Sequence, residues 1–408
     1  MKNINLDYFF VFDIIFMCES DELFFFGGNK MLTQKDLTGI LDNFSLAGKF
    51  VSCVPIDDGH INDTFKVTYE INGKEIHHLL QRINTDVFKN PDQLMANVNY
   101  VTSFLRDKVI ASGGNPERET LYCKPCKNGK KYFTSNEGKV WRLYNYVEDS
   151  FSYNSIESPE VFFRAGQAFG NFQRNLSDFP IDRLYETIPD FHNTAKRYKN
   201  LCNSIEKNAS GRAEYAASEI EFARARRDET YILTGKAEIG ELPIRVTHND
   251  TKLNNVLFDK KTDMPICVVD LDTVMPGLSL YDFGDAIRFG ANTGAEDEKD
   301  LSKVSLDLGL YEQYVRGFLS SAGDSLTAAE VECLPLSAKI MTFECGMRFL
   351  TDYIDGDVYF KTAYKEHNLV RCRSQFALVA DIEKKFGEMK KITADAYKEI
   401  CGKDIEIQ

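Results

Sequence analysis

The chain has 408 residues, 43% of them hydrophobic and 27% charged, which is the composition of a folded protein and excludes a disordered one. Its length exceeds the roughly 250–300 residues at which a single hydrophobic core stops growing, so we expect two lobes with a cleft between them. The 62 acidic and 49 basic residues give a formal net charge of −13, which disfavours nucleic acid and anionic membranes as partners and favours a small ligand.

The first thirty residues form an apolar segment of their own. Asp7, Asp13 and Glu19 interrupt it, and no apolar run reaches the ~18 residues of a membrane span. Asp13 also breaks the apolar core that a signal peptide would need. We therefore expect residues 1–30 to be an extension outside the fold, with the folded part starting at Met31. The ten cysteines are scattered over a long chain, which predicts reduced thiols and a cytoplasmic location.

Residues 31–147 carry the patterns of a small β-rich lobe. Hairpin turns are indicated at Asn72-Gly73 and at residues 136–138, each between runs of strand-forming residues. Between these hairpins, residues 91–105 place apolar side chains at helical spacing. A small sheet with one helix is the expected product.

Residues 148–408 change to helical patterns. Ser158 followed by Pro159 marks a helix start, and most residues from 326 to 402 also have helical periodicity. A short β segment interrupts these helices. The predicted fold class is therefore α+β, with a small β-rich N-lobe and a larger, mainly helical C-lobe.

The stretch RVTHNDTKLNNVLFD, residues 245–259, concentrates polar side chains between apolar runs. Two short strands follow Asn255, and Asp270 stands at the end of the second. Because a hairpin brings its two ends together, Asn255 and Asp270 should face the same spot, with Asp250 beside them. Two oxygen ligands suit Mg²⁺, while a separate carboxylate can accept the proton of an attacking hydroxyl. This arrangement favours phosphoryl transfer.

Asp-x-x-x-x-Asn followed by a metal-binding Asp is the catalytic-loop spacing of protein kinases and their small-molecule relatives. Lys252 would then reach the transferred phosphoryl group as a point charge. His248 would brace the loop by hydrogen bonding rather than titrate. The simpler alternative is that Asp250, Asn254 and Asn255 are only turn residues, since Asx side chains favour turns. The joint pattern with a second Asp behind a hairpin argues against that alternative.

Other candidate sites are weaker. Cys123 and Cys126 form a lone CxxC, which we expect to be two thiols in a turn. His77 and His78 are adjacent, so on a strand they point to opposite faces and cannot readily chelate one metal. Trp141 is expected in the core.

Several segments resemble the aminoglycoside phosphotransferase and choline kinase-like family. They are HNDTKLNN, VVDLDTVMPG and YDFGDAIRFGA, then DDGHINDTF, LLQRINTDVF and WRLYNYVE in the β-rich lobe, and ECGMRFLTDYIDGDVYF and EHNLVRCR near the end. The resemblance runs from Thr33 to the C-terminal helices and is closest to the N-acetylhexosamine 1-kinases within the family. It implies a bilobal, protein kinase-like fold.

Carried over to this chain, the resemblance implies transfer of the γ-phosphate of ATP to the anomeric hydroxyl of GlcNAc or GalNAc, with Mg²⁺ as cofactor. Asp250 would be the base and Lys252 the cation at the phosphoryl group, with Asn255 and Asp270 holding the metal. For Arg348 and Tyr359, an ion pair or packing would serve equally well. The sugar contacts implied are Asp250, Asp272, Thr273, Phe289, Arg348 and Tyr359.

The nucleotide-binding residues implied in the β-rich lobe and its connector are Gly59, His60, Asn62, Arg82, Tyr146 and Val147. The first three would cover the phosphates with backbone N–H groups, and the last two would meet adenine through main-chain groups. Arg82 takes the place of the phosphate-pairing Lys of protein kinases, which is held by a helix Glu. Residues 91–105 contain no Glu, and the corresponding slot reads Asn97-Val98-Asn99. Arg82 therefore has another partner or needs none.

ATP and a small sugar are thus the expected partners of a monomeric protein. Two alternatives stay open. Another kinase of the same fold could act on choline, an aminoglycoside or an amino alcohol, whose cationic group would call for an acidic or aromatic cage. A non-catalytic nucleotide-binding pseudokinase would usually have lost the base or a metal ligand, whereas Asp250, Asn255 and Asp270 are all present.

Overall fold

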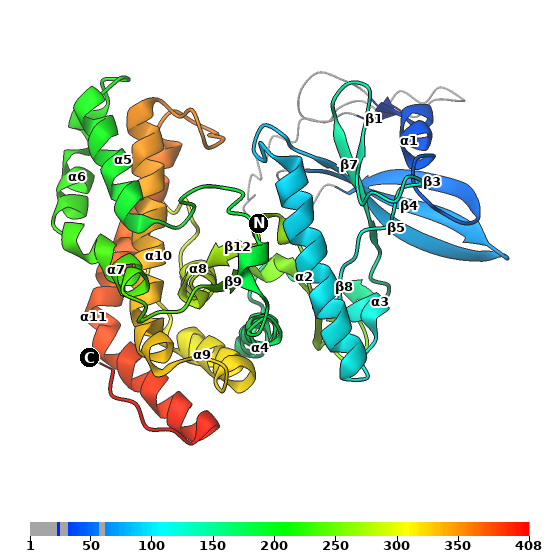
Figure 1. The fold of residues 1–408 in the computed structure, drawn as a ribbon. Helices are drawn as coiled ribbons and strands as arrows, with labels where there is room; N and C mark the ends of the chain where they lie inside the picture. The colour runs from blue at the N-terminus through cyan, green and yellow to red at the C-terminus, as the bar shows by residue number, and fades with distance from the viewer. Residues whose placement is uncertain (1–22, 25–31, 57–61, 408) are drawn as a thin grey trace, which may run out of the picture. The chain divides into compact units, whose positions relative to one another are not determined.

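A computed structural model describes residues 23–24, 32–56 and 62–407 of the chain. Most of the expected N-terminal extension lies outside the described residues, as do Gly59 and His60. The expected fold class is confirmed, with strands dominating the first part of the chain and helices the rest (Figure 1).

The contacts within the chain define two compact units. The first comprises the described residues up to Pro91 together with Tyr122–Tyr146, and the second comprises Asp92–Leu121 together with residues 147–407. The contacts thus group residues 92–121 with the helical unit, whereas the sequence places them in the β-rich lobe. The lobe boundaries expected from the sequence stay a prediction.

The first unit is a five-stranded antiparallel sheet with a short helix and a small β pair. Its elements are β1 (Leu23–Phe24), β2 (Leu32–Thr33), α1 (Gln34–Leu41), β3 (Lys49–Ile56), β4 (Asp63–Ile71), β5 (Lys74–Ile83), β6 (Phe133–Thr134) and β7 (Val140–Asn145). The strand order of the sheet is β3-β4-β5-β7-β6. Asn72 and Gly73 have φ of 53° and 78° and join β4 to β5, so the first expected hairpin is confirmed. The second joins β6 to β7 around residues 136–138.

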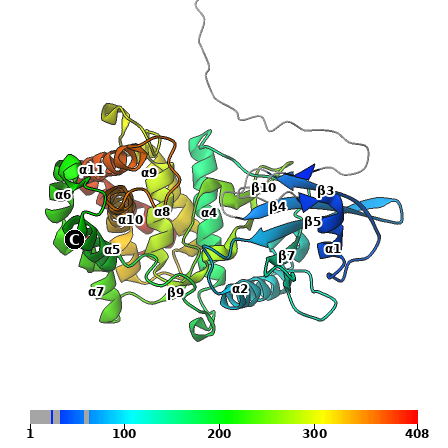
Figure 2. The ribbon, with the colours of Figure 1, turned by 90° about the horizontal axis from the view of Figure 1, so that it is seen from above.

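Helix α1 lies beside this sheet in both views and shares its core (Figures 1 and 2). The helix begins with a capping box, in which the Thr33 hydroxyl accepts from the Asp36 backbone and the Asp36 carboxylate accepts from the Thr33 backbone. Trp141 is only 1% exposed, which confirms its expected place in the core. Cys123 and Cys126 are buried free thiols. The core residues of this cluster include Leu37, Leu41, Phe44, Phe65, Val67, Leu80 and Leu143.

The second unit is mainly helical. Its α-helices are α2 (Pro91–Ala111), α3 (Pro116–Glu119), α4 (Pro159–Asn175), α5 (Thr194–Lys207), α6 (Ala217–Arg224), α7 (Ile232–Glu238), α8 (Ser279–Gly290), α9 (Leu308–Ala322), α10 (Ala328–Asp355) and α11 (His367–Cys401). Short 3-10 turns are η1 (Ile181–Arg183), η2 (Ala213–Ala216), η3 (Arg227–Tyr231), η4 (Leu253–Asn255), η5 (Leu271–Thr273) and η6 (Leu301–Lys303). Within the part of the chain that is described, none of the helices is both long and apolar enough to cross a membrane.

Helices α4 and α9 pack with their backbones almost touching. A Cβ added at Gly317 would lie 2.0 Å from the backbone oxygen of Phe163, and one added at Gly166 would lie 2.6 Å from that of Tyr314. These close approaches require glycine. Helix α4 starts at the expected cap, where the Ser158 hydroxyl accepts from the backbone of Val161.

The β island expected among the helices is present as two small antiparallel sheets. Its strands are β8 (Ser150–Phe151), β9 (Arg245–Thr247), β10 (Val256–Asp259), β11 (Pro265–Val268) and β12 (Met275–Gly277), in the orders β11-β10-β8 and β12-β9. Arg245 ties β9 to α10, because its Nε and Nη2 lie 2.5 and 2.7 Å from the two carboxylate oxygens of Glu330. Burial alone would raise the pKa of Glu330, but Arg245 and the Ser279 hydroxyl hold it below its usual value.

Helix α2 is anchored inside the second unit by a buried amide. The Asn97 side chain donates to the backbone oxygens of Tyr185 and Val274, at 2.7 and 2.9 Å, and accepts from the Tyr185 backbone N–H at 2.8 Å. Three of the four hydrogen-bonding positions of its amide are therefore directed at backbone far away in the sequence. Asn99, two residues on, donates only to Met95 of its own helix.

We expect Asn97→Ala to lower the free energy of unfolding by about 2–4 kcal/mol, because it leaves buried backbone groups without partners. Asn99→Ala is the matched control and should change it far less. Chemical denaturation of both variants measures the difference. Equal effects of the two substitutions would contradict the anchoring role of Asn97.

Candidate active site

A buried carboxylate organises the loop after β9. Asp282, in the first turn of α8, is fully buried and accepts the backbone N–H groups of His248 and Asn249 at 2.9 and 2.7 Å. Gln173 of α4 donates to the same carboxylate at 2.6 Å. Burial raises the pKa of Asp282 although these donors oppose the change. Sequence reasoning missed this residue, which stands in the quoted segment YDFGDAIRFGA with no role assigned.

His248 braces the loop, as expected. Its side chain is buried, with Nε2 2.9 Å from the backbone oxygen of Val269 and Nδ1 3.3 Å from the backbone nitrogen of Asp250. The tautomer with the proton on Nε2 satisfies both contacts. The rings of Phe169 and Phe172 pack edge-on against the imidazole. These contacts fix the backbone of Asp250 from one side.

Asn255 fixes Asp250 from the other side. Its Nδ2 donates to the backbone oxygen of Asp250 at 2.8 Å and lies 3.2 Å from the carboxylate oxygen Oδ2. The amide oxygen of Asn255 is consequently directed away from Asp250. Lys252 approaches the other carboxylate oxygen, with Nζ 3.0 Å from Oδ1. Burial would lower the pKa of Lys252, but Asp250 and then Asp285 raise it above its usual value, so the ammonium stays charged.

The hairpin expected after Asn255 is confirmed. Val256 pairs with Val268, and the backbone N–H of Val269 donates to the backbone oxygen of Asn255 at 2.9 Å. Asp270 therefore follows directly beside Asn255. It has a left-handed backbone, with φ of 59°, which is uncommon for a residue with a side chain and is concentrated at functional sites.

Asn255 and Asp270 offer an amide oxygen and a carboxylate, the hard oxygen donors that Mg²⁺ binds. Nowhere in the described residues do three or more His, Cys, Asp or Glu side chains gather as a metal cluster. A site of two protein ligands fits an ion that takes its remaining ligands from water and from nucleotide phosphates. Their role as metal ligands stays a prediction.

The expected nucleotide residues that the structure describes in the first unit, Asn62, Arg82 and Tyr146, lie on or beside its sheet. Arg82 on β5 forms an ion pair with Asp63, the residue directly opposite on β4. Asn62 accepts from the backbone N–H of Asn84 at 2.9 Å. The Tyr146 ring, at the end of the unit, packs against His77. Val147, the first residue of the second unit's long segment, is buried.

A family model described as the phosphotransferase enzyme family matches residues 52–314, well over half of the chain. The chain belongs to this family. Arg82, Asp250, Asn255 and Asp270 all lie within the matched region.

Solved phosphotransferases have the same fold. An aminoglycoside phosphotransferase from Alicyclobacillus acidocaldarius is 11% identical, with a TM-score of 0.55 over 90% of this chain and 96% of that one. A choline kinase from Cryptosporidium parvum is 12% identical, with a TM-score of 0.52 over 88% of this chain and 97% of that one. A microcompartment-associated aminopropanol kinase is 14% identical, with a TM-score of 0.51 over 87% and 97%. At such identities the similarity shows the fold and no particular acceptor.

Two of the expected sugar-binding residues of this phosphotransferase come together. The Arg348 guanidinium on α10 lies 5.5 Å from each of the Phe191 and Phe360 rings. Tyr359 packs edge-on against Phe360, at 4.8 Å between ring centroids, and is 67% exposed. Asp352, a buried residue that sequence reasoning missed, holds this loop by accepting the backbone N–H groups of Val358, Tyr359 and Phe360.

The other expected sugar residues are placed differently. Thr273 lies at the end of η5, and its hydroxyl donates to the backbone oxygen of His248 at 2.6 Å. Its only hydroxyl proton is therefore engaged within the protein. Asp272 is buried, and Phe289 is 41% exposed near the end of α8.

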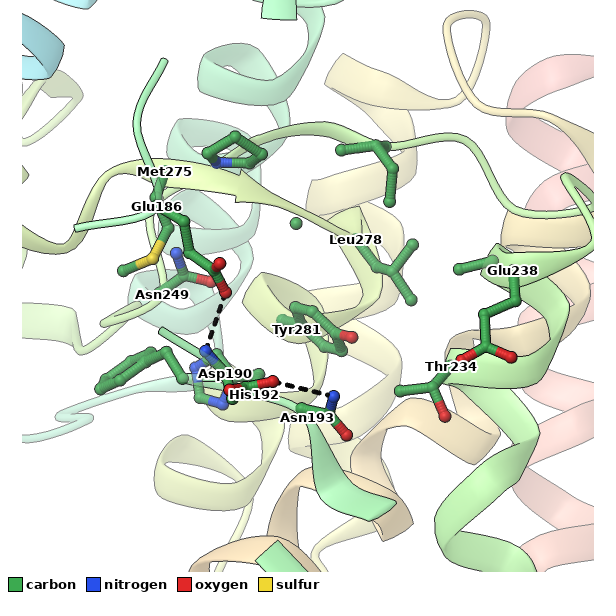
Figure 3. Close-up of a pocket in the computed structure, with 15 residues that line it drawn as sticks. Glu186, Asp190, His192, Asn193, Thr234, Glu238, Asn249, Met275, Leu278 and Tyr281 are labelled. Carbon is green, nitrogen blue, oxygen red and sulfur yellow. Dashed lines mark hydrogen bonds between the residues drawn. The ribbon is translucent and has the colours of Figure 1, made fainter. Parts of the chain in front are cut away.

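A cavity of about 240 Å³ lies beside Asn249, the residue before Asp250. Figure 3 shows Glu186 and Asp190 on one side and Glu238 on the other, with Tyr281 between them. Its lining in the described residues contains no lysine or arginine. The remaining lining residues are Phe191, His192, Asn193, Thr234, Ala237, Ile244, Met275, Pro276, Gly277 and Leu278.

We expect Asp282→Asn to speed hydrogen exchange at the amides of His248 and Asn249 by about ten- to a hundredfold, because it weakens charge-assisted bonds to both. Asp285→Asn, on the same helix, is the control. Asp285 pairs with Arg288 and should leave these two amides protected. If both variants exposed the amides equally, Asp282 would not be their specific support.

Proposed function

We propose that this phosphotransferase is an ATP-dependent N-acetylhexosamine 1-kinase, which transfers the γ-phosphate of ATP to the anomeric hydroxyl of GlcNAc or GalNAc. The observation that carries the proposal is the Asp250 carboxylate, which Asn255 and Lys252 contact at its two oxygens. The hairpin that follows Asn255 brings Asp270 next to it. We further propose that it acts as a cytoplasmic monomer without a nucleic-acid or membrane partner.

Each group at this site has a distinct role in the proposed reaction. Asp250 accepts the proton of the sugar hydroxyl as it attacks. Lys252, 3.0 Å from the same carboxylate, places a positive charge next to the phosphoryl group in transfer. Mg²⁺ held by Asn255 and Asp270 would neutralise charge on the phosphates.

The surroundings of Arg348 favour a neutral acceptor. Among the described residues it forms no ion pair with a carboxylate, so its N–H groups are available to hydroxyl or acetyl oxygens. Arg197 lies close enough that burial and then the Arg348 charge lower its pKa. Two guanidinium groups would repel a cationic acceptor, whereas a sugar ring can pack on the exposed Tyr359.

The acidic cavity beside Asn249 favours a second candidate function, the phosphorylation of an amino alcohol. Glu186, Asp190 and Glu238 supply negative charge, and Phe191 and Tyr281 supply aromatic faces, the two features that bind ammonium groups. Asp190 is already paired with Lys196, which reduces the charge left for a ligand.

A panel of acceptors separates these two candidates. Incubated with Mg·ATP, the protein should produce ADP with GlcNAc or GalNAc and much less with glucose, galactose, choline or aminopropanol. ADP formation in a coupled assay, with the sugar phosphate confirmed by mass spectrometry, measures the outcome. Turnover of an amine-bearing alcohol without turnover of either N-acetyl sugar would replace the first candidate by the second.

Asp250→Asn tests catalysis itself and excludes a pseudokinase. It should reduce kcat by about 10²–10⁴-fold while Mg·ATP still binds, because it removes the base and little else. Asp228→Asn, an exposed carboxylate in η3, is the matched control and should keep full activity. Unchanged turnover in Asp250→Asn would remove that residue from its proposed role.

A further inference from the structure

We propose that Asp63 positions the triphosphate of ATP by holding the Arg82 guanidinium, in the place of the helix glutamate that protein kinases use. The inference rests on the proposed role of Arg82 at the phosphates. The partner of Arg82, which the sequence did not identify, is thus Asp63 on the neighbouring strand of the sheet.

The pair is fixed by strand register. Asp63 on β4 stands directly opposite Arg82 on β5, so their side chains leave the sheet on the same face. Arg82 Nε lies 2.5 Å from Asp63 Oδ2, and Nη2 contacts the same oxygen. The side chains are 17% and 22% exposed, so the charge-assisted bonds are partly shielded from water.

Arg82 is also supported from its other neighbouring strand. Trp141 on β7 is its register partner, and the guanidinium carbon lies 5.9 Å from the indole ring. A side chain held by a carboxylate on one side and an aromatic ring on the other has little freedom left. Its unused N–H groups therefore point in a defined direction before any ligand binds.

The geometry requires an arginine rather than a lysine. Nε and one N–H of Nη2 are directed at Asp63, which leaves Nη1 and the second N–H of Nη2 for phosphate oxygens. A lysine ammonium is a single point that cannot form the same fork towards both partners. Protein kinases carry a lysine at this position. The contacts with Asp63 explain why this chain carries an arginine instead.

Helix α2 carries an asparagine where protein kinases have that carboxylate. Asn97 stands in the slot where protein kinases carry the glutamate, and its amide forms three hydrogen bonds to the backbone of Tyr185 and Val274 within the second unit. Two residues of the first unit, Asp63 and Trp141, contact the Arg82 side chain instead. Asp63 therefore supplies to Arg82 the carboxylate that the Asn97 position lacks.

Calorimetric titration of the full-length protein with Mg·ATP and with adenosine, in the absence of any acceptor, tests the proposal. Asp63→Asn should weaken Mg·ATP binding by about ten- to a hundredfold, since it weakens a charge-assisted contact, and leave adenosine binding unchanged. Arg82→Lys should show the same selective loss. Asp63→Glu, which keeps the carboxylate, should recover part of the Mg·ATP affinity.

Glu70→Gln is the matched control, an exposed carboxylate at the other end of β4 that pairs opposite Glu75. It should bind both ligands like the wild type. Wild-type affinity for Mg·ATP in Asp63→Asn, or an equal loss of Mg·ATP and adenosine, would overturn the positioning role. A wild-type protein that binds Mg·ATP as expected yet phosphorylates no sugar would leave this inference standing and refute only the proposed acceptor.

Discussion

The Asp282 carboxylate is the interaction on which the geometry of the candidate site depends. It lies at the start of α8, is fully buried, and accepts two consecutive backbone N–H groups from the loop after β9. A buried charge without such donors would be very costly, so the loop and the helix stabilise each other. His248 then extends the same support to Asp250, and Asn249 adopts a left-handed backbone with φ of 65° between them.

Much of this site can be predicted from sequence because its parts are local. Asn255 and Asp270 are joined by one hairpin, and alternating strand patterns with a turn between them are sufficient to bring their ends together. The brace formed by His248 follows in the same way from its place two residues before Asp250. The fold class was also predictable, since strand patterns precede helical ones along the chain.

The contacts that sequence reasoning missed are those that depend on register or on distant packing. Asp63 and Arg82 are opposite each other only in one pairing of β4 with β5, and a shift by one residue would move Asp63 to the other face. Arg348 meets Phe191 across more than 150 positions of the chain, through the packing of α10. The hydrogen bond from Asn97 to the backbone oxygen of Val274 also depends on the packing of segments far apart in the sequence.

Two positions depart from the protein kinase pattern, Arg82 in place of a lysine and Asn97 in place of a helix glutamate. One physical requirement links them. A cation that holds phosphates must itself be held, because a flexible guanidinium loses side-chain entropy whenever it binds a ligand. In this chain the helix position that could have supplied a carboxylate is an asparagine, and its amide satisfies buried backbone groups instead. A glutamate there could not donate to the oxygens of Tyr185 and Val274, so the slot cannot serve both purposes. Asp63 meets the requirement from the neighbouring strand, where the rigid spacing of the sheet sets the distance between the two side chains.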